Sequence, residues 1–346
     1  MKHQTTRYGE IPFYKIGTFG NTADAFISKK LFLEYQTKYS FPKKGDILIS
    51  ASGTIGRAVI YDGKPAYFQD SNIVWIDNDE TLVKNDFLFY AYSNVKWNTE
   101  HTTILRLYND NFRNTLIPLP PLNEQSAIAN ILSDLDRYLY ALRALILKKE
   151  GVKKALSFEL LSQRKRLRGF NQAWQKVRLG DIANYLTSNL SVEQITQQGK
   201  IKVYDVNNFI GYTDTTFISD KPYISIVKDG SVGRVRILPP KTNILSTMGA
   251  LIANHRTTTE FLFYLLSNFD FKNFTSGSII PHIYFKDYKE KTIFLPPLNE
   301  QIAIANILSA LDNEIISLKN KKRQFENIKK ALNHDLMSAK IRVLKK

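Results

Sequence analysis

The stretch LPPLNEQ occurs twice in this chain of 346 residues, at 119–125 and again at 295–301. Nearly the same run follows each copy, SAIANILSDLD after the first and IAIANILSALD after the second. Self-similarity at a fixed offset, here 176 residues, indicates that the chain contains two versions of one structural unit joined end to end. The repeat predicts a duplicated reader of an extended, two-part target.

Each copy of the repeat also predicts the start of a long helix. The two prolines prevent a helix from extending backwards. The asparagine that follows, Asn123 or Asn299, can cap the helix by accepting a hydrogen bond from a free N–H group. The next two residues of each copy suit the positive end of the helix dipole. They are Glu124 and Gln125 in the first copy and Glu300 and Gln301 in the second.

Apolar residues then recur at spacings of three and four, which is typical of a coiled-coil seam. Each helix is expected to run about 40 residues, or on the order of 60 Å, with Gly151 as a point where the first helix can fray or bend. Two such helices in one chain most simply pack as an antiparallel pair with pseudo-twofold symmetry. The alternative is that the heptads join two copies of the chain. The expected seam of the first helix contains Ile128, Ile131, Leu135, Tyr138, Leu142 and Leu145, with Leu132 and Leu139 beside them. The expected seam of the second contains Ile304, Ile307, Leu311, Ile315, Leu318, Lys322, Phe325, Ile328 or Lys329, Leu332 and Leu336.

The segments before the helices match less closely but in the same order. The run SGTIGR at 52–57 corresponds to DGSVGR at 229–234, with strands expected on both sides of the first. FLFY occurs in both units as a predicted short buried helix, and the strands predicted at 11–16 and 201–206 also correspond. The predicted fold is α+β, with a pseudo-twofold internal repeat. Its predicted parts are two β-rich domains, residues 1–116 and 169–292, and two helical spacers, residues 117–168 and 293–346.

One mismatch between the two units concerns their openings. The second unit has VRLGDIA at 177–183 and about 15 more residues before its strand at Ile201, whereas the first has only ten residues before Ile11. The first globular domain is therefore expected to lack an N-terminal piece that the second possesses.

The charge of the chain points to a polyanionic partner. The net charge is +16 and the pI is near 9.6. Each helical spacer carries 10 basic and 5 acidic residues, so both are expected to lie near phosphate or near an acidic protein. The alternative is a basic protein that is merely soluble.

The cysteine content and the hydropathy of the chain limit the classes of protein to which it can belong. The chain has no cysteine, which excludes disulfides and Cys-ligated metal sites and suits a reducing cytoplasm. The polar opening MKHQTTRYGE predicts no signal peptide. The lack of any apolar run near 20 residues predicts no membrane span.

A search for catalytic motifs finds none. The chain has no GxxxxGK[ST] or GxGxxG loop, no GxSxG serine, and no Asn/Asp-Pro-Pro-aromatic motif of a base methyltransferase. The glycines of GTIGR and GSVGR are expected to be turn residues with unusual backbone angles. We predict no catalytic residue, metal or cofactor in this chain. The histidines, which lack metal-ligand spacing, are His3, His101, His255, His282 and His334.

Polar loops beside the strands carry the candidate contacts. At the 176-residue offset, His282 aligns with Arg106, while Tyr284 aligns with Tyr108. A kept framework with different polar neighbours is expected of two readers of different base sequences, although drift in a surface loop would look the same. The arginines of the two turns are expected to contact phosphate or to hold the turn. The predicted nucleic-acid-binding residues are Arg57, Arg106, Tyr108, Asn109, Arg234, Thr275, Ser276, Ser278, His282 and Lys286.

The doubled LPPLNEQ-x-AIANILS-x-LD, the VRLGDIA run and the paired GTIGR and GSVGR turns resemble the specificity subunits of type I restriction–modification systems, over essentially the whole length. The resemblance implies two target recognition domains, each reading one half of a bipartite site on double-stranded DNA. Between them it implies an antiparallel coiled coil that sets the distance between the halves. Family members usually open with a segment like 177–183, which the first unit lacks.

The resemblance also implies partners. Two modification subunits, which carry S-adenosylmethionine and the methyltransferase site, would dock on the helices. Restriction subunits, which use ATP and Mg, would complete the complex. The chain itself would be a non-catalytic, cytoplasmic recognition subunit without a membrane partner. The candidate docking positions lie at the helix starts and are Asn123, Glu124, Gln125, Asn299, Glu300 and Gln301.

The expected mechanism is that of a ruler. Two readers on one face of DNA would lie about 34–36 Å apart, or a multiple of that. The first alternative is a coiled-coil protein-interaction scaffold without DNA specificity. The second is an enzyme that acts on nucleic acid alone.

Overall fold

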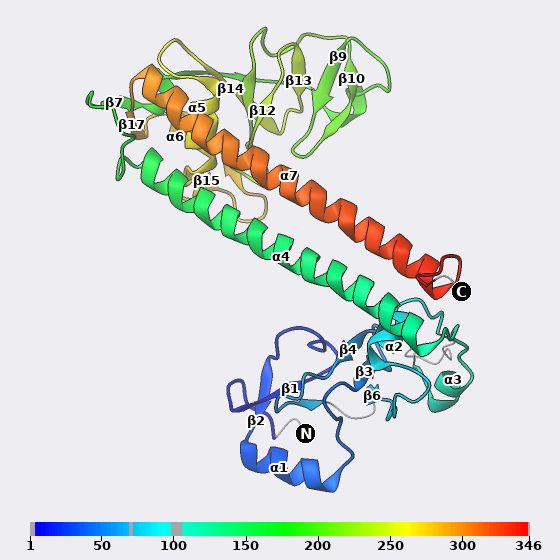
Figure 1. Cartoon of the computed structure of the whole chain (residues 1–346). Coiled ribbons are helices and arrows are strands. Elements are labelled where there is room, and N and C mark those ends of the chain that lie inside the picture. Colours follow the sequence, from blue (N-terminus) through cyan, green and yellow to red (C-terminus); the bar gives the residue numbers. More distant parts are fainter. Residues whose placement is uncertain (1–3, 69–71, 98–105, 345–346) are drawn as a thin grey trace. The chain divides into compact units, whose positions relative to one another are not determined.

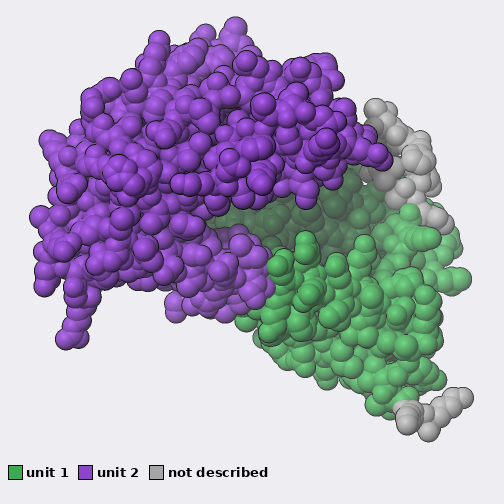
Figure 2. All heavy atoms as spheres, turned by 90° about the horizontal axis from the view of Figure 1, so that it is seen from above, with its two compact units in different colours: residues 1–143, 320–346 green, residues 144–319 purple. Residues whose placement is uncertain are grey.

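The structure is a computed structural model that describes residues 4–68, 72–97 and 106–344 (Figure 1). The chain divides into two compact units, residues 1–143 with 320–346 and residues 144–319 (Figure 2). Each unit is a β-rich domain together with one half of each of two long helices. The boundaries of the two units lie within the long helices and not at their ends. The four predicted segments, 1–116, 117–168, 169–292 and 293–346, therefore remain a prediction of the domain organisation.

Unit 1 contains two small sheets. The first has the order β2-β1-β5, and β1 pairs antiparallel with β2 but parallel with β5. The second has the order β4-β3-β6 and is antiparallel throughout. The elements are β1 (Ile11–Tyr14), β2 (Ala25–Ile27), α1 (Lys29–Lys38), β3 (Ile47–Ser50), β4 (Ala58–Ile60), β5 (Tyr67–Phe68), β6 (Ile73–Trp75), α2 (Asn85–Tyr92) and α3 (Asn109–Arg113).

Unit 2 repeats this plan and adds to it. Its sheets have the orders β10-β9-β13, β12-β11-β14-β8, β15-β16 and β17-β7. The strands are β7 (Gln175–Arg178), β8 (Ala183–Thr187), β9 (Ile201–Tyr204), β10 (Phe209–Thr213), β11 (Tyr223–Val227), β12 (Val235–Leu238), β13 (Thr242–Ile244), β14 (Met248–Ala253), β15 (Thr275–Ser276), β16 (His282–Ile283) and β17 (Thr292–Leu295). The helices of this domain are α5 (Thr259–Ser267) and α6 (Phe285–Tyr288), with single 3-10 turns at 179–181, 192–194 and 272–274.

The internal repeat is visible element by element. The sheet of β3, β4 and β6 corresponds to that of β11, β12 and β14, and α2 corresponds to α5. The strands predicted before and after GTIGR and the short helix predicted at FLFY are confirmed. Strand β8 and the β7–β17 pair have no counterpart among the described residues of unit 1.

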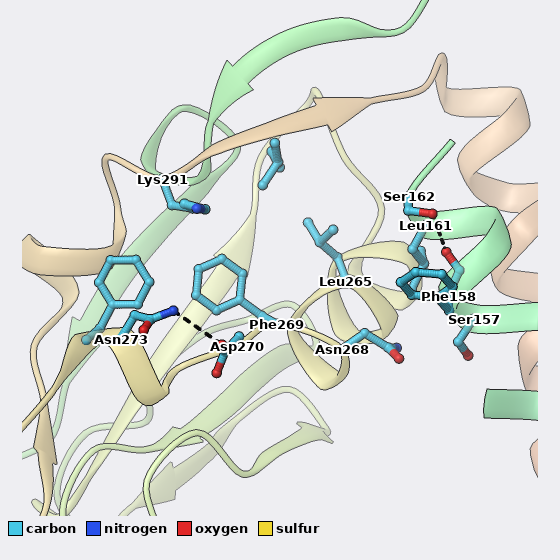
Figure 3. Close-up of a pocket in the computed structure, with 12 residues that line it drawn as sticks. Ser157, Phe158, Leu161, Ser162, Leu265, Asn268, Phe269, Asp270, Asn273 and Lys291 are labelled. Atoms are coloured by element: carbon cyan, nitrogen blue, oxygen red, sulfur yellow. Dashed lines mark hydrogen bonds between the residues drawn. The ribbon is translucent and has the colours of Figure 1, made fainter. Parts of the chain in front are cut away.

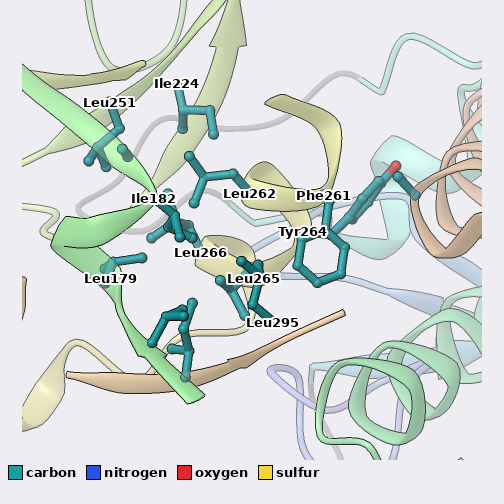
Figure 4. Close-up of a cluster of buried hydrophobic side chains, with 14 of the residues drawn as sticks. Leu179, Ile182, Ile224, Leu251, Phe261, Leu262, Tyr264, Leu265, Leu266 and Leu295 are labelled. Atoms are coloured by element: carbon teal, nitrogen blue, oxygen red, sulfur yellow. The ribbon is translucent and has the colours of Figure 1, made fainter. Parts of the chain in front are cut away.

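The core of unit 2 forms around α5. Thr258 caps this helix by accepting a hydrogen bond from the Phe261 amide at 3.2 Å. The apolar face of α5 packs against buried residues of β11, β14 and β17 (Figure 4). Phe261 and Leu262 are fully buried there, so truncation of Phe261 to alanine would cost about 3–5 kcal/mol of stability.

Two helices of 40 residues each, α4 (Leu122–Leu161) and α7 (Leu298–Met337), follow the LPPLNEQ copies. Each begins one residue before the predicted asparagine cap, so that Asn123 and Asn299 lie inside the first turn. Their side chains still accept a free N–H, that of Glu124 or Glu300, at 2.9 Å. Helix α4 continues through Gly151 without a break. No helix within the described ranges is both long enough and apolar enough to cross a membrane.

The helices run antiparallel within each unit, as predicted. In unit 1 the first half of α4 packs on the second half of α7, with an ion pair from Lys329 to Asp136 at 2.5 Å. In unit 2 the second half of α4 packs on the first half of α7, with an ion pair from Lys153 to Asp312 at 2.5 Å. Both residues of one pair lie 176 positions from their counterparts in the other. The pseudo-twofold repeat is therefore expressed in the helix contacts.

The predicted seam is partly wrong. Leu132, expected beside the seam, and its counterpart Leu308 are fully buried, whereas Ile131, Ile307 and Ile328, which are expected at the seam, are 37%, 36% and 50% exposed. The buried face is rotated because it faces α2 or α5 as well as the other helix. Leu132, for example, belongs to a buried cluster with Phe87 of α2.

Candidate nucleic-acid interface

The GxxGR turns adopt the same backbone in both units. In unit 2 the turn joins β11 to β12, and Gly233 has φ +80°. A Cβ there would lie 2.6 Å from the ring of Phe271. In unit 1 the turn joins β3 to β4, Gly56 has φ +82°, and a Cβ would collide with the indole of Trp97. The prediction that these glycines supply unusual backbone angles is confirmed.

The glycine requirement can be measured by two substitutions in one turn. Gly230 and Gly233 share a φ near +80°, but no atom lies within 4 Å of a Cβ built on Gly230. Gly230→Ala should cost only the left-handed backbone penalty of about 1–2 kcal/mol. Gly233→Ala should cost about 1–3 kcal/mol more, because Phe271 must move. Chemical denaturation of both variants measures the difference, and equal losses would contradict the packing role of Phe271.

Each turn is joined to the loop that contains the aligned polar residues. An isolated antiparallel bridge pairs Ser52 with Arg106 in unit 1, and its counterpart pairs Asp229 with His282 in unit 2. Backbone hydrogen bonds fix both loops: the Leu107 amide donates to Ala51 and the Ile283 amide donates to Lys228, each at 2.9 Å. Arg106 and His282 therefore occupy equivalent backbone positions beside equivalent turns.

The His282 side chain is held by a partner that the sequence did not reveal. Its Nδ1 lies 2.7 Å from a carboxylate oxygen of Asp229, so Nδ1 donates to that carboxylate and Nε2 is the ring atom left for a ligand. The ring stacks on Tyr284 at 6.4 Å, and Lys286 lies 5.5 Å from the centre of the same Tyr284 ring. Burial, and secondarily Asp229, raises the pKa of the nearby Tyr185 hydroxyl, which stays protonated.

The hairpin β15–β16 presents the remaining candidates of unit 2. Thr275, Ser276 and Ser278 are exposed. Thr275 donates to the Phe271 carbonyl at 2.9 Å, which ties the hairpin to the ring beneath Gly233. The three hydroxyl residues and His282 are thus brought together on one hairpin.

The predicted DNA-binding side chains of unit 1 make fewer contacts within the chain than those of unit 2. Arg106 is exposed, and Tyr108 and Asn109 lie at the start of α3, where Tyr108 is 41% exposed. The guanidinium of Arg57 donates to the Phe19 carbonyl at 3.0 Å, so this arginine holds a loop. Within the described residues, the exposed side chain of its counterpart Arg234 makes no hydrogen bond or ion pair. The two arginines therefore differ in their contacts.

The glutamines of the helix starts are buried hubs. Gln301 accepts hydrogen bonds from the Thr257 hydroxyl at 2.9 Å and the Thr258 amide at 3.1 Å. It donates to the carbonyls of Arg256 at 2.9 Å and Pro296 at 2.8 Å. Its side chain joins the start of α7 to the loop before α5.

Gln125 repeats these contacts in unit 1. It accepts from the Lys84 amide at 2.7 Å and donates to the carbonyls of Leu82 at 3.0 Å and Pro120 at 2.8 Å. Its side chain joins the start of α4 to the loop before α2.

The neighbouring glutamates are also bound within the chain. Glu300 is fully buried and accepts from Arg166 at 2.6 Å and from the Trp174 indole at 2.9 Å. Glu124 pairs with Arg342, whose hydrogen bonds lower the pKa of the Glu124 carboxyl. Glu124, Gln125, Glu300 and Gln301 are therefore buried side chains that hold the helix starts within the chain, and their role in docking a partner stays a prediction.

A second contact also joins each β-rich domain to the long helices. The Tyr264 hydroxyl donates to Asp312 at 2.9 Å, and the Tyr90 hydroxyl donates to Asp136 at the same distance. Burial, and then the hydrogen-bonded aspartate, raises the pKa of both tyrosines, so that both hydroxyls stay protonated and remain donors.

The described part of the chain contains no group of three or more His, Cys, Asp or Glu residues that could hold a metal ion. Two of the histidines considered above, His3 and His101, lie outside the described residues. The chemistry that the described interface offers is hydrogen bonding and charge.

Comparison with known proteins gives a single family. The family described as "Type I restriction modification DNA specificity domain" matches residues 1–149 and again 171–327. A putative type I restriction enzyme specificity subunit of Haemophilus influenzae, S.HindORF215P, is 64% identical over 133 residues. That match covers 38% of this chain and 34% of the relative's length. The putative MjaX specificity subunit of Methanocaldococcus jannaschii is 29% identical, over 86% of this chain and 79% of its own.

Solved structures support the same fold. The S subunit of a type I restriction–modification system from M. genitalium superimposes with a TM-score of 0.65 at 20% sequence identity. The match covers 97% of this chain and 91% of that one.

Proposed function

Since this chain belongs to the family of type I restriction–modification DNA specificity proteins, we propose that its two β-rich domains read the two halves of a bipartite DNA sequence. The observation that carries the proposal is the repeated bridge between the GxxGR turn and a polar loop. Its backbone is the same in both units, but its side chains are Ser52 and Arg106 in one and Asp229 and His282 in the other. An identical scaffold with different contact groups suits two different half-sites.

The side chains suggest what each domain reads. Arg106 offers a fork of donors, which suits the N7 and O6 acceptors of guanine in the major groove. His282 donates from Nδ1 to Asp229, so its Nε2 faces the ligand; in the tautomer with the proton on Nδ1, Nε2 offers an acceptor for the amino group of adenine or cytosine. The exposed Arg234 suits a phosphate contact, and the net charge of +16 predicts affinity that falls as salt rises.

Modification subunits would dock on exposed parts of the long helices. Three aliphatic positions of the long helices are exposed in both repeats: Leu122 with Leu298, Ile131 with Ile307, and Val152 with Ile328. A repeated apolar surface suits two copies of one partner. On this proposal the partners bring S-adenosylmethionine, ATP and Mg, restriction subunits complete the assembly, and this chain is a non-catalytic cytoplasmic subunit.

Methylome sequencing tests the proposal. Cells that express this chain with its modification subunit should acquire methylation at one bipartite motif with a fixed gap. Cells that express the modification subunit alone should not. Methylation at a continuous motif, or equal methylation without this chain, would contradict the proposed function.

Substitutions in the two bridges assign the half-sites. His282→Ala and Arg106→Ala should each weaken recognition of one half-site only, by about 1–3 kcal/mol. The two variants serve as controls for each other, because each leaves the other domain unchanged. If either one weakened binding to specific and random DNA equally, its base-reading role would be wrong.

A further inference from the structure

A tyrosine of β8, Tyr185, extends toward the bridge of unit 2 that begins at Asp229. Tyr185 is opposite Leu251 of β14 in the sheet, and its side chain is partly buried. A Cβ built on Gly249 would lie 2.3 Å from the Tyr185 hydroxyl oxygen, so the ring extends over Gly249. Gly249 is opposite Ile226, which precedes Asp229 by three residues. The ring is therefore directed to the end of the sheet at which the bridge lies.

The ring of Tyr185 is fixed by packing, but its hydroxyl has no partner. The ring stacks on Phe285 with the two centroids 4.5 Å apart and the planes 10° from parallel. The hydroxyl makes no hydrogen bond to any residue that the structure describes. Burial, and then the charge of Asp229, raises the pKa of this hydroxyl, so it stays protonated and keeps a proton to donate. Unit 2 therefore holds a positioned donor beside Asp229 that nothing within the described chain uses.

The corresponding strands of unit 1 leave no space for such a ring. Ile226 and Ile49 are equivalent, since each lies four residues before the first glycine of its GxxGR turn. Ile226 is opposite Gly249, whereas Ile49 is opposite Val74. The Cβ of Val74 stands where a Cβ on Gly249 would collide with the tyrosine ring. This position therefore differs between the two units, as expected of residues that read different half-sites.

A hollow beside the C-terminal end of α5 does not distinguish the two units. It measures about 440 Å³ and is lined by Leu161 of α4 and Leu265 of α5, among others (Figure 3). Unit 1 has its counterpart, of about 460 Å³, lined by Met337 and Ala91 at the equivalent positions. Since this hollow occurs in both units, it is not a candidate for reading a sequence that differs between them.

We propose that Tyr185 is a further specificity-determining residue of unit 2, and that its hydroxyl donates a hydrogen bond to the base that His282 reads. The inference rests on the proposed reading of DNA and deepens it. His282 with its proton on Nδ1 offers an acceptor, and Tyr185 offers a donor. Adenine presents an amino group beside the N7 acceptor in the major groove, whereas cytosine presents only the amino group. The pair of side chains therefore selects adenine over cytosine at one position of the half-site.

Methylome sequencing of cells that express the Tyr185→Phe variant with the modification subunit tests the proposal. The substitution removes only the hydroxyl and keeps the ring that stacks on Phe285. The wild-type chain should direct methylation to a motif with adenine at the position that His282→Ala also affects. In the variant the preference for adenine over cytosine at that position should fall by about tenfold. The other positions, the gap and the half-site of unit 1 should stay unchanged.

Two further variants sharpen the test. Gly249 does not have a positive φ, so the strain that Gly249→Ala adds is a clash with the Tyr185 ring. This variant should displace the hydroxyl and relax the preference at the same position. Tyr288→Phe is the matched control, because it removes a hydroxyl from a ring that also contacts Phe285 but is only 1% exposed. It should leave the motif unchanged, and circular dichroism establishes that each variant is folded.

Each outcome decides the proposal. Relaxation in Tyr185→Phe at the position that His282 reads, with no change in Tyr288→Phe, supports it. A wild-type bipartite motif that Tyr185→Phe leaves unchanged overturns this inference alone. Relaxation at another position, or an equal loss at every position of the half-site, also overturns it, since the tyrosine would then act elsewhere or only through packing. Absence of any bipartite motif for the wild-type chain would overturn the proposed function itself, and this inference with it.

Discussion

Lengthening both long helices by four residues should abolish methylation at the original DNA site and create methylation at a site with a wider gap. Four helical residues add about 6 Å, and DNA rises about 3.4 Å per base pair, so the gap should grow by about two base pairs. The insertions belong between Arg143 and Ala144 in α4 and between Lys319 and Asn320 in α7. These are the boundaries of the two compact units, so the helix contacts within each unit are kept.

The control is a variant with four substitutions on the exposed face of the same helical turns and no insertion. It should retain the original gap and the original half-sites. Methylome sequencing of both variants reads the gap directly. An unchanged gap after insertion would exclude the helices as the ruler, and unchanged half-sites with a new gap would confirm that reading and spacing are separate.

Gln301→Ala should lower the stability of unit 2 by about 3 kcal/mol. The substitution leaves the Thr258 amide and the carbonyls of Arg256 and Pro296 buried without partners, and each such group costs about 1–3 kcal/mol. Hydrogen exchange measured by mass spectrometry should show faster exchange at 256–261 and at the start of α7. Chemical denaturation gives the total loss.

Two further variants sharpen this test. Gln125→Ala should produce the same effect in unit 1, at 82–88 and the start of α4, and leave unit 2 protected. Asn299→Ala removes one bond to a helix-start amide and should cost about 1 kcal/mol or less. If Gln301→Ala cost no more than Asn299→Ala, the glutamine would not be a structural hub.

The two long helices could be predicted from the sequence because the residues that determine where each helix begins lie close together in the chain. Prolines, an asparagine and periodic apolar residues within one short stretch were enough to place α4 and α7 within one residue at their starts. The buried face differs from the predicted seam at Ile131 because heptad spacing considers only the partner helix. In the fold, α2 also packs on α4, and this contact buries Leu132 instead.

The details of the interface depend on residues that are distant in sequence. Gln125 appeared to be a residue suited to the helix dipole, because its partners Leu82 and Lys84 lie more than 40 positions away. The contact of His282 with Asp229 spans 53 positions. A signal for it was nevertheless present, since Ser52 and Arg106 both change between the repeats where Asp229 and His282 stand.

The contacts of Gln125 and Gln301 have a consequence for how the β-rich domains of such a chain can change in evolution. Gln125 is hydrogen-bonded to the loop before α2 only through main-chain groups. Gln301 is hydrogen-bonded to the loop before α5 through main-chain groups and the Thr257 hydroxyl. Because these hydrogen bonds go to the backbone of the loop, they require almost no particular side chains in the domain that the glutamine holds. Recombination within the LPPLNEQ copies would then replace one β-rich domain by another with a different surface. The glutamine at the helix start would form the same main-chain hydrogen bonds with the new domain.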